Sequence, residues 1–293
     1  MIYLLLTIVF SAVLVLMFKV FQHKQVPVFQ AIVVNYVSAS VCAFLFLPDK
    51  TPVLNGSILH QNWLWLALVL GSLFFTVFNL VSKTTVSFGV STASVAMKLG
   101  LVFPVLLAFT IYGEEFNWLK LVGILLAFVA VILSSIKEDH EVHKHSKWMV
   151  VLPFIAFLGS GLCDSLTQFA NKRYVSSDGM EGFSFFLFVA AAFAGVVGLA
   201  FRMVTAKMKL PFKAIIGGVI LGIFNYFSFL FLLKALAAVS WGSSVLFPVM
   251  NLGTVAFATI AGVLMFREKI SKINLLGLFF AALSIGAILL SGK

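Results

Sequence analysis

The chain has 293 residues, of which 62% are hydrophobic and 10% are charged, and its formal net charge is +10. Average proteins are roughly 25% charged, so this composition excludes a soluble domain and predicts a multi-pass integral protein of the cell membrane. The lysines and arginines are scattered through short connections and form no basic block with interleaved aromatic residues, which excludes a nucleic-acid-binding protein.

Ten apolar runs are long enough to cross a bilayer as helices, because about 20 residues at a rise of about 1.5 Å per residue span a hydrocarbon core about 30 Å thick. In chain order they are Ile2–Phe21, Val28–Leu47, Trp63–Val81, Val90–Tyr112, Trp118–Ile136, Trp148–Ala170, Phe183–Phe201, Ala214–Leu233, Val239–Phe266 and Ile273–Leu290. Transmembrane strands need only about 10 residues of alternating polarity, so we predict an all-α integral membrane protein with ten transmembrane helices. The first run lacks the features of a cleaved signal peptide, and we interpret it as a retained helix.

Two stretches of the chain carry similar residues in the same order, which indicates a diverged internal duplication. A glycine, a phenylalanine-asparagine pair and a serine recur at one constant offset, and in both copies a glutamate is followed nine residues later by a glycine. The positions are Gly71, Phe78-Asn79, Ser82, Glu114 and Gly123 in the first copy and Gly217, Phe224-Asn225, Ser228, Glu268 and Gly277 in the second.

The longest polar connection, KEDHEVHKHSK, separates five predicted spans from five. We therefore predict a first five-helix repeat over residues 1–136, a connecting loop over 137–147 and a second five-helix repeat over 148–293. An odd number of spans per repeat reverses the orientation of the second copy, so the two halves are predicted to be inverted repeats. In secondary transporters this arrangement places the substrate near the membrane midplane, between the repeats.

Lys98 is the first candidate for a functional residue, because it lies deep inside the fourth apolar run. A charge at that depth costs at least about 2.5 kcal/mol, so it is normally buried in protein or faces a wet cavity. Asp164 lies in the sixth run and shares a helical face with Gln168 and Asn171. We expect Lys98 and Asp164 to pair across the repeat interface, either to bind substrate or to fix the packing of the bundle.

Four asparagines inside apolar runs complete the candidate site. Asn79 and Asn225 are related by the duplication, whereas Asn35 and Asn251 lie in the second and ninth runs. Their alternative role is interhelical hydrogen bonding, which contributes roughly 1 kcal/mol or less. The predicted substrate-binding residues are Lys98, Asp164, Gln168, Asn79, Asn225, Asn251 and Asn35.

Two prolines, Pro104 and Pro248, interrupt backbone hydrogen bonding in the fourth and ninth runs, and such interruptions often mark a transport site. Two glycine motifs, Gly218-x-x-x-Gly222 and Gly159-Ser160-Gly161, are typical of close helix packing. The turns that hold Glu114 and Glu268 lie at the membrane edge, where we expect each carboxylate to cap the start of a helix.

No catalytic apparatus is evident in the sequence. It has no phosphate-binding loop, nucleophile elbow or metalloprotease motif, so we predict neither an enzyme nor a bound cofactor. The histidines at 140, 143 and 145 fall in the polar loop without a ligand spacing on a rigid element, and we interpret them as solvated rather than metal-binding.

The ten spans in two halves, with Gly113-Glu114 and Gly123 echoed by Arg267-Glu268-Lys269 and Gly277, resemble the EamA-type transporters of the drug/metabolite transporter superfamily. The resemblance covers essentially the whole chain and rests on the architecture more than on single motifs. The chain departs from the family pattern at Lys98, near a position where many members have proline.

The resemblance implies a secondary transporter that moves a small molecule, such as an amino acid, organic anion, sugar or drug-like compound, by alternating access. A coupled proton or counter-substrate, and a monomer or homodimer in the lipid bilayer, are the expected partners and assembly. We expect a central cavity lined by the third, fourth, eighth and ninth helices. The alternative is a non-transporting scaffold or an intramembrane lipid-modifying protein.

The charge distribution and the family resemblance predict opposite orientations in the membrane. Loops that follow odd-numbered spans hold thirteen lysines and arginines and the opposite side holds six, which by the positive-inside rule puts both termini outside. The family resemblance implies cytoplasmic termini instead.

Overall fold

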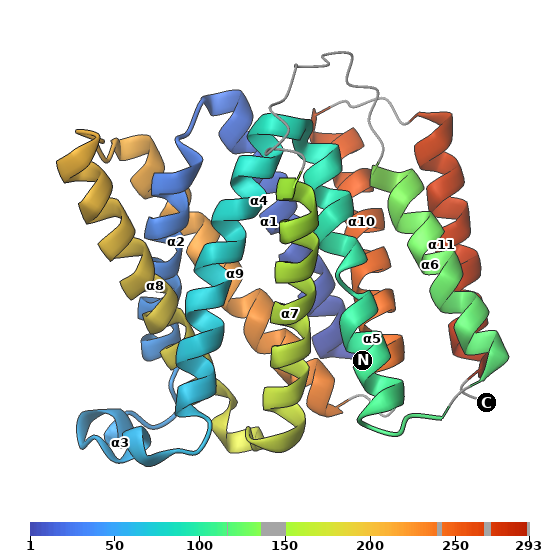
Figure 1. Cartoon of the computed structure of the whole chain (residues 1–293), viewed down its shortest axis with the longest axis horizontal. Helices are drawn as coiled ribbons and strands as arrows, with labels where there is room; N and C mark the ends of the chain where they lie inside the picture. The colour runs from blue at the N-terminus through green and yellow to red at the C-terminus, as the bar shows by residue number, and fades with distance from the viewer. Residues whose placement is uncertain (116, 136–150, 239–241, 267–270, 292–293) are drawn as a thin grey trace. The chain divides into compact units, whose positions relative to one another are not determined.

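The structure is a computed structural model of the chain, and it describes residues 1–115, 117–135, 151–238, 242–266 and 271–291 (Figure 1). Within these ranges only the backbone is described at 85–96, 134–135, 266, 274, 288–289 and 291. The predicted connecting loop with its histidines, and the turn that holds Glu268, therefore lie outside the described residues.

Every regular element in the described ranges is helical. The α-helices are α1 (Ile2–Lys24), α2 (Val28–Leu45), α3 (Thr51–Leu54), α4 (Leu64–Leu99), α5 (Val102–Thr110), α6 (Trp118–Ser135), α7 (Val151–Arg173), α8 (Met180–Thr205), α9 (Phe212–Ala238), α10 (Ser243–Phe266) and α11 (Lys272–Ser291). Two short 3-10 helices are η1 (Ser57–His60) and η2 (Ser177–Gly179). The all-α prediction is confirmed.

The described helices have the length and surface of membrane spans. Seven are long and apolar enough to cross a bilayer, and three shorter apolar helices cover 97–110, 118–133 and 275–287. Large hydrophobic side chains are left exposed on the long helices, with Phe193 72% and Leu264 76% exposed. Such surfaces are stable against lipid, so the chain is a multi-pass integral membrane protein. Ten spans arranged as inverted repeats stay a prediction.

The third and fourth predicted spans were placed with the wrong break between them. The structure has one helix of 36 residues, α4, where the sequence predicted a loop between Val81 and Val90. Lys83 is polar but does not break a helix, and the segment contains no proline. The helix ends instead at Leu99, because Pro104 has no N–H to donate to the carbonyl of Gly100. That carbonyl accepts a hydrogen bond from Phe103 N at 3.1 Å.

The chain forms two compact units, and each takes segments from both sides of the predicted connecting loop. Unit 1 comprises residues Met1–Asn79 and Phe169–Ala237, and unit 2 comprises Leu80–Gln168 and Ala238–Lys293. The predicted division into 1–136 and 148–293 describes duplication in the sequence and stays a prediction.

Unit 1 is held together by close helix packing and aromatic side chains. A Cβ added to Gly218 of α9 would lie 2.5 Å from Val34 Cβ, and one added to Gly222 would lie 2.7 Å from Ser38 Cβ, so α9 packs directly on α2. The packing role predicted for this glycine motif is confirmed. Helix α2 also packs on α8, where Tyr36 is fully buried and lies 6.4 Å, centroid to centroid, from Phe188.

Unit 2 is built on small residues between its helices. Helix α6 packs along α11, and α10 packs on α5 and α6. The buried cluster between them comprises Ala127, Ala130, Val131, Leu252 and Ala281. Ser284 Oγ donates a hydrogen bond of 2.6 Å to the carbonyl of Gly123, the glycine that the duplication singled out.

Candidate functional site

The break between α4 and α5 fixes the position of Lys98, which lies in the last turn of α4. Gly100 packs tightly on α7: an added Cβ would lie 2.5 Å from Ser160 Oγ and 2.7 Å from Gly161 N. Ser160 Oγ also donates a hydrogen bond of 3.1 Å to the carbonyl of Met97, one of the carbonyls at the end of α4. The predicted packing role of Gly159-Ser160-Gly161 is thus confirmed, and it holds the end of α4 against α7.

Lys98 reaches a partner on a third helix. Its Nζ donates a hydrogen bond of 2.8 Å to Oδ1 of Asn251 in α10. Asn251 is buried, with 4% of its surface exposed, whereas Lys98 is half-buried. An ammonium has three protons to donate, so this contact leaves donor capacity at the nitrogen.

Asp164 of α7 is the oppositely charged member of the group. It is half-buried and interacts electrostatically with Lys98, and within the described ranges neither a hydrogen bond nor an ion pair engages its carboxylate. The predicted approach of Lys98 and Asp164 is therefore observed as an interaction through space rather than a direct ion pair. Three helices, α4, α7 and α10, present a cation, an anion and an amide to one region of unit 2.

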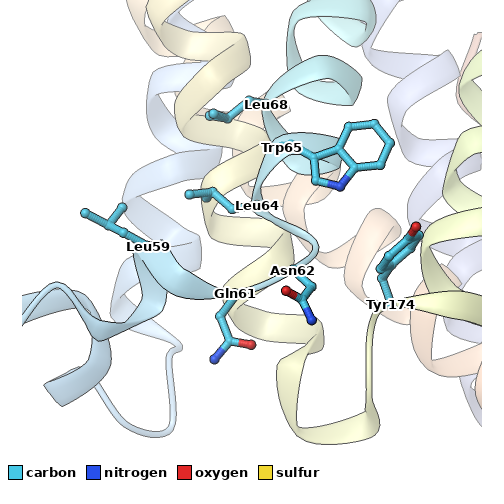
Figure 2. Close-up of a pocket in the computed structure, with 7 residues that line it drawn as sticks. All are labelled: Leu59, Gln61, Asn62, Leu64, Trp65, Leu68 and Tyr174. Carbon is cyan, nitrogen blue, oxygen red and sulfur yellow. The ribbon is translucent and has the colours of Figure 1, made fainter.

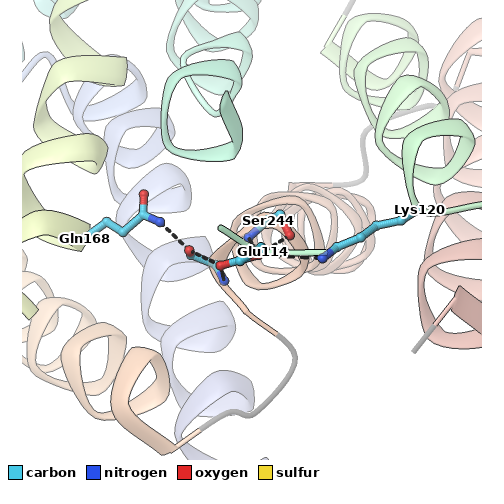
Figure 3. Close-up of polar contacts among 5 residues, drawn as sticks. Glu114, Lys120, Gln168 and Ser244 are labelled. Atoms are coloured by element: carbon cyan, nitrogen blue, oxygen red, sulfur yellow. Dashed lines mark hydrogen bonds and ion pairs between the residues drawn. The ribbon is translucent and has the colours of Figure 1, made fainter. Parts of the chain in front are cut away.

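Gln168 lies one turn after Asp164 but joins a different cluster (Figure 3). It is fully buried, and its Nε2 donates a short hydrogen bond to Ser243 Oγ at the start of α10. Because that hydroxyl uses its own proton on Glu114, Gln168 has to present its N–H₂ here. Its Oε1 is buried without a partner in the described part of the chain.

The carboxylate of Glu114, in the turn after α5, is the centre of this second cluster (Figure 3). Its Oε1 accepts hydrogen bonds from Ser243 N at 2.8 Å and Ser243 Oγ at 2.7 Å. Its Oε2 accepts one from Ser244 N at 3.2 Å and a short one from Ser244 Oγ. Lys120 Nζ lies 3.6 Å from Oε2. We name this group of Glu114, Lys120, Gln168, Ser243 and Ser244 the Glu114 clasp.

The clasp determines the charge state of its carboxyl group. Burial raises the pKa of Glu114, but the hydrogen bonds from the side chains and backbone of Ser244 and Ser243 outweigh burial and lower the pKa to about 2. The carboxylate is therefore ionised at neutral pH. The sequence predicted a helix-capping carboxylate, and Glu114 does cap a helix start, that of α10, 129 residues along the chain.

Comparisons with known proteins agree with the helical membrane fold. The family model for the EamA-like transporter family matches residues 1–136. An uncharacterized protein of Haemophilus influenzae is 30% identical over 281 residues, which cover 95% of this chain and 94% of the relative. The chain belongs to the EamA-like transporter family. A solved crystal structure, 14% identical, superposes with a TM-score of 0.74 over 99% of this chain and 96% of that chain, and shares its fold.

The remaining candidates of this EamA-like protein lie in unit 1. Asn225 Nδ2 donates a hydrogen bond of 3.2 Å to Asn35 Oδ1, and both side chains are buried. Asn79 Nδ2 donates to the carbonyl of Phe75 in its own helix at 2.8 Å. Lys98, Asp164 and Asn251 thus come together, Gln168 joins the Glu114 clasp, and the three other asparagines have structural partners within unit 1.

Unit 1 also has an open hollow of about 550 Å³ at the start of α4 (Figure 2). It is lined by Leu59, Gln61, Asn62, Leu64, Trp65, Leu68 and Tyr174. Most of these residues are apolar, and none of the predicted site residues is among them. Among the residues that the structure describes, no group of three histidine, cysteine or acidic side chains is placed to hold a metal ion.

Proposed function

We propose that this EamA-like protein is a secondary transporter that moves a small polar metabolite by alternating access, with Lys98, Asp164 and Asn251 as its substrate-binding residues. The observation that carries the proposal is the bonding capacity that the described residues of unit 2 leave unused at Lys98 and Asp164. Lys98 makes one hydrogen bond, and the carboxylate of Asp164 has none in the described ranges.

A purely structural charge pair would be expected to close on itself. Charged groups inside a bilayer are costly, and direct pairing with additional hydrogen bonds reduces that cost. Lys98 and Asp164 are instead held on separate helices, and both are half-buried. This arrangement favours a ligand site over the scaffold alternative, which predicts a closed and dry pair.

The chemistry of the three side chains limits the substrate. An ammonium with a neighbouring amide recognises a carboxylate or another anionic group, and a free carboxylate recognises a cationic or hydroxyl group. Amino acids and organic anions therefore head the substrate classes to test, followed by sugars and drug-like compounds. The ionisable pair also supplies two places at which a coupled proton can be carried.

The test is uptake into proteoliposomes of a labelled panel of these compounds, with and without a pH gradient, for the wild type and Lys98→Ala. Lys83→Ala is the matched control, because Lys83 lies in the same helix but is exposed. Flux in the wild type and in Lys83→Ala that is lost in Lys98→Ala supports the proposal. Flux unchanged in folded Lys98→Ala removes Lys98 from the site, and no flux of any compound favours the scaffold.

A further inference from the structure

Three of the four segments that the Glu114 clasp joins carry, or directly follow, the three proposed substrate-binding residues. Glu114 follows α5, which begins directly after the break beside Lys98. Ser243 and Asn251 are eight residues apart on α10, and Gln168 and Asp164 are one turn apart on α7. A helix transmits position along its axis at about 1.5 Å per residue, so the clasp lies about 12 Å along α10 from Asn251.

The backbone around the clasp is adapted to the carboxylate. Gly242, directly before α10, has φ +78°, and a Cβ there would lie 2.6 Å from Glu114 Cδ. Gly113, directly before Glu114, has φ +62°. Both positions favour glycine because other L-residues rarely adopt this backbone conformation. The side chains of Glu114 and Lys120 are each only 11% exposed, so solvent does not screen the carboxylate as it would on an open surface.

The hydrogen bonds of the clasp fix both the position and the orientation of the start of α10 relative to the Glu114 carboxylate. Two adjacent backbone N–H groups and two hydroxyls converge on the two oxygens of one carboxylate, and Gln168 approaches Ser243 from the side of α7. Hydrogen bonds to an ionised acceptor are short and directional. A shift of α10 along its axis would break several of them at once.

We propose that Glu114 is a positioning residue for transport: by fixing the first turn of α10, and α7 through Gln168, it holds Asn251 and Asp164 in register with Lys98 and thereby sets the affinity for substrate. The inference rests on the transport function proposed above. All members of the clasp lie within unit 2.

The first experiment compares Glu114→Gln with Glu115→Gln in proteoliposomes. Glu115 is the neighbouring glutamate, and it is exposed. Glu114→Gln presents an N–H₂ group to donors that need an acceptor. The KM of this variant for substrate uptake is therefore expected to rise about tenfold, with Vmax within about twofold of the wild type. Glu115→Gln should behave as the wild type. A role in folding alone would lower Vmax, through fewer active carriers, and leave KM unchanged; that result overturns the proposal.

Chemical rescue separates the carboxylate from the rest of the side chain. Glu114→Ala leaves the N–H groups and hydroxyls of Ser243 and Ser244 without their acceptor, and formate is a carboxylate small enough to replace it. Added sodium formate is expected to lower the raised KM of Glu114→Ala, whereas sodium chloride is not. Formate should not rescue Glu114→Gln, where the side chain still fills the space. If formate does not change the KM of Glu114→Ala, the role proposed for the carboxylate in the Glu114 clasp is contradicted.

Alkylation of Cys163 tests the clasp without transport. Cys163 is buried in α7, next to Asp164, and with Cys42→Ser it becomes the single thiol. Loosening α7 at Gln168 should raise the alkylation rate severalfold in Glu114→Gln but not in Glu115→Gln, and formate should reverse the rise in Glu114→Ala. Equal rates overturn the inference. A wild type without flux overturns only the transport proposal, because this measurement still tests the clasp.

Ser244→Ala keeps the clasp testable if the Glu114 variants fail to fold. It removes one hydroxyl and leaves the carboxylate and the backbone N–H groups in place. A smaller rise in KM, with faster alkylation of Cys163, supports the proposal. Wild-type values for both overturn it.

Discussion

The two units of the protein differ in how their polar side chains are partnered. In unit 1 several polar side chains have direct partners: Asn35 with Asn225, Ser11 with Ser228 at 2.7 Å, and Lys234 with Glu181 at 2.8 Å. In unit 2 the charged side chains of Lys98 and Asp164 project from apolar helices, and they do not form a direct ion pair. Directly paired groups fix packing at a low cost, whereas charges inside a membrane without a direct partner are costly and often mark functional sites.

The largest effect is expected from removing the separated charge in unit 2. Asp164→Asn leaves Lys98 with its partial burial but without its anion, and uptake should fall about thirtyfold or more. The measurement is initial uptake at a fixed amount of folded protein. Asp178→Asn, at an exposed position in η2, is the control. Equal uptake in the two variants would remove the functional distinction between the units.

In unit 1 a large loss of stability is expected from a substitution that changes no charge. Gly222→Val would place a side chain where an added Cβ already lies 2.7 Å from Ser38 Cβ and 3.0 Å from Ala39 N. Overpacking of this kind costs about 1–3 kcal/mol, which thermal unfolding in detergent measures. Gly286→Ala is the matched control in α11, because nothing described lies within 4 Å of the added Cβ. A tolerated valine at 222 would contradict the close approach of α9 to α2.

A smaller effect is expected from acid, and it should come from unit 2. The Glu114 pKa is lowered from 4.5 to about 2 in the folded protein. Stability from the ionised carboxylate is therefore fully present above pH 4.5 and is lost as the pH falls from 4.5 to about 2. Unfolding midpoints measured across this range should fall more steeply for the wild type than for Glu114→Gln. Parallel curves would show that the clasp contributes nothing to acid sensitivity.

The smallest effect is expected from the neutral pair in unit 1. A double-mutant cycle of Asn35→Ala and Asn225→Ala should give a coupling energy of about 0.6 kcal/mol, typical of hydrogen bonds between helices in membranes. The readout is the unfolding free energy of the four proteins. A coupling several times larger would mean that unit 1 also depends on a polar network.

The sequence predicts features that depend on local composition, and it does not predict contacts that depend on how distant helices are aligned. Lys98 was found because a charge in an apolar run is costly wherever it lies. Asn251 and Lys98 are both predicted as site residues, but their hydrogen bond is not, because that contact spans 153 residues. The sequence does not predict the continuous α4, because the polar residues near Lys83 interrupt the apolar run without breaking the helix. The acceptor role of Glu114 was predicted, and the distant helix start that it caps was not.

The end of α4 has a consequence for the electric field at Lys98. The peptide dipoles of a helix add up to roughly half a negative elementary charge at its C-terminus, concentrated in the last turn. Lys98 lies in that turn of a 36-residue helix. Its ammonium therefore has two negative neighbours of different kinds: the carboxylate of Asp164, which a proton neutralises, and the terminal carbonyls of α4, which no proton neutralises. A change in pH alters only the first, so part of the field in the site is constant under all conditions in which the protein is folded.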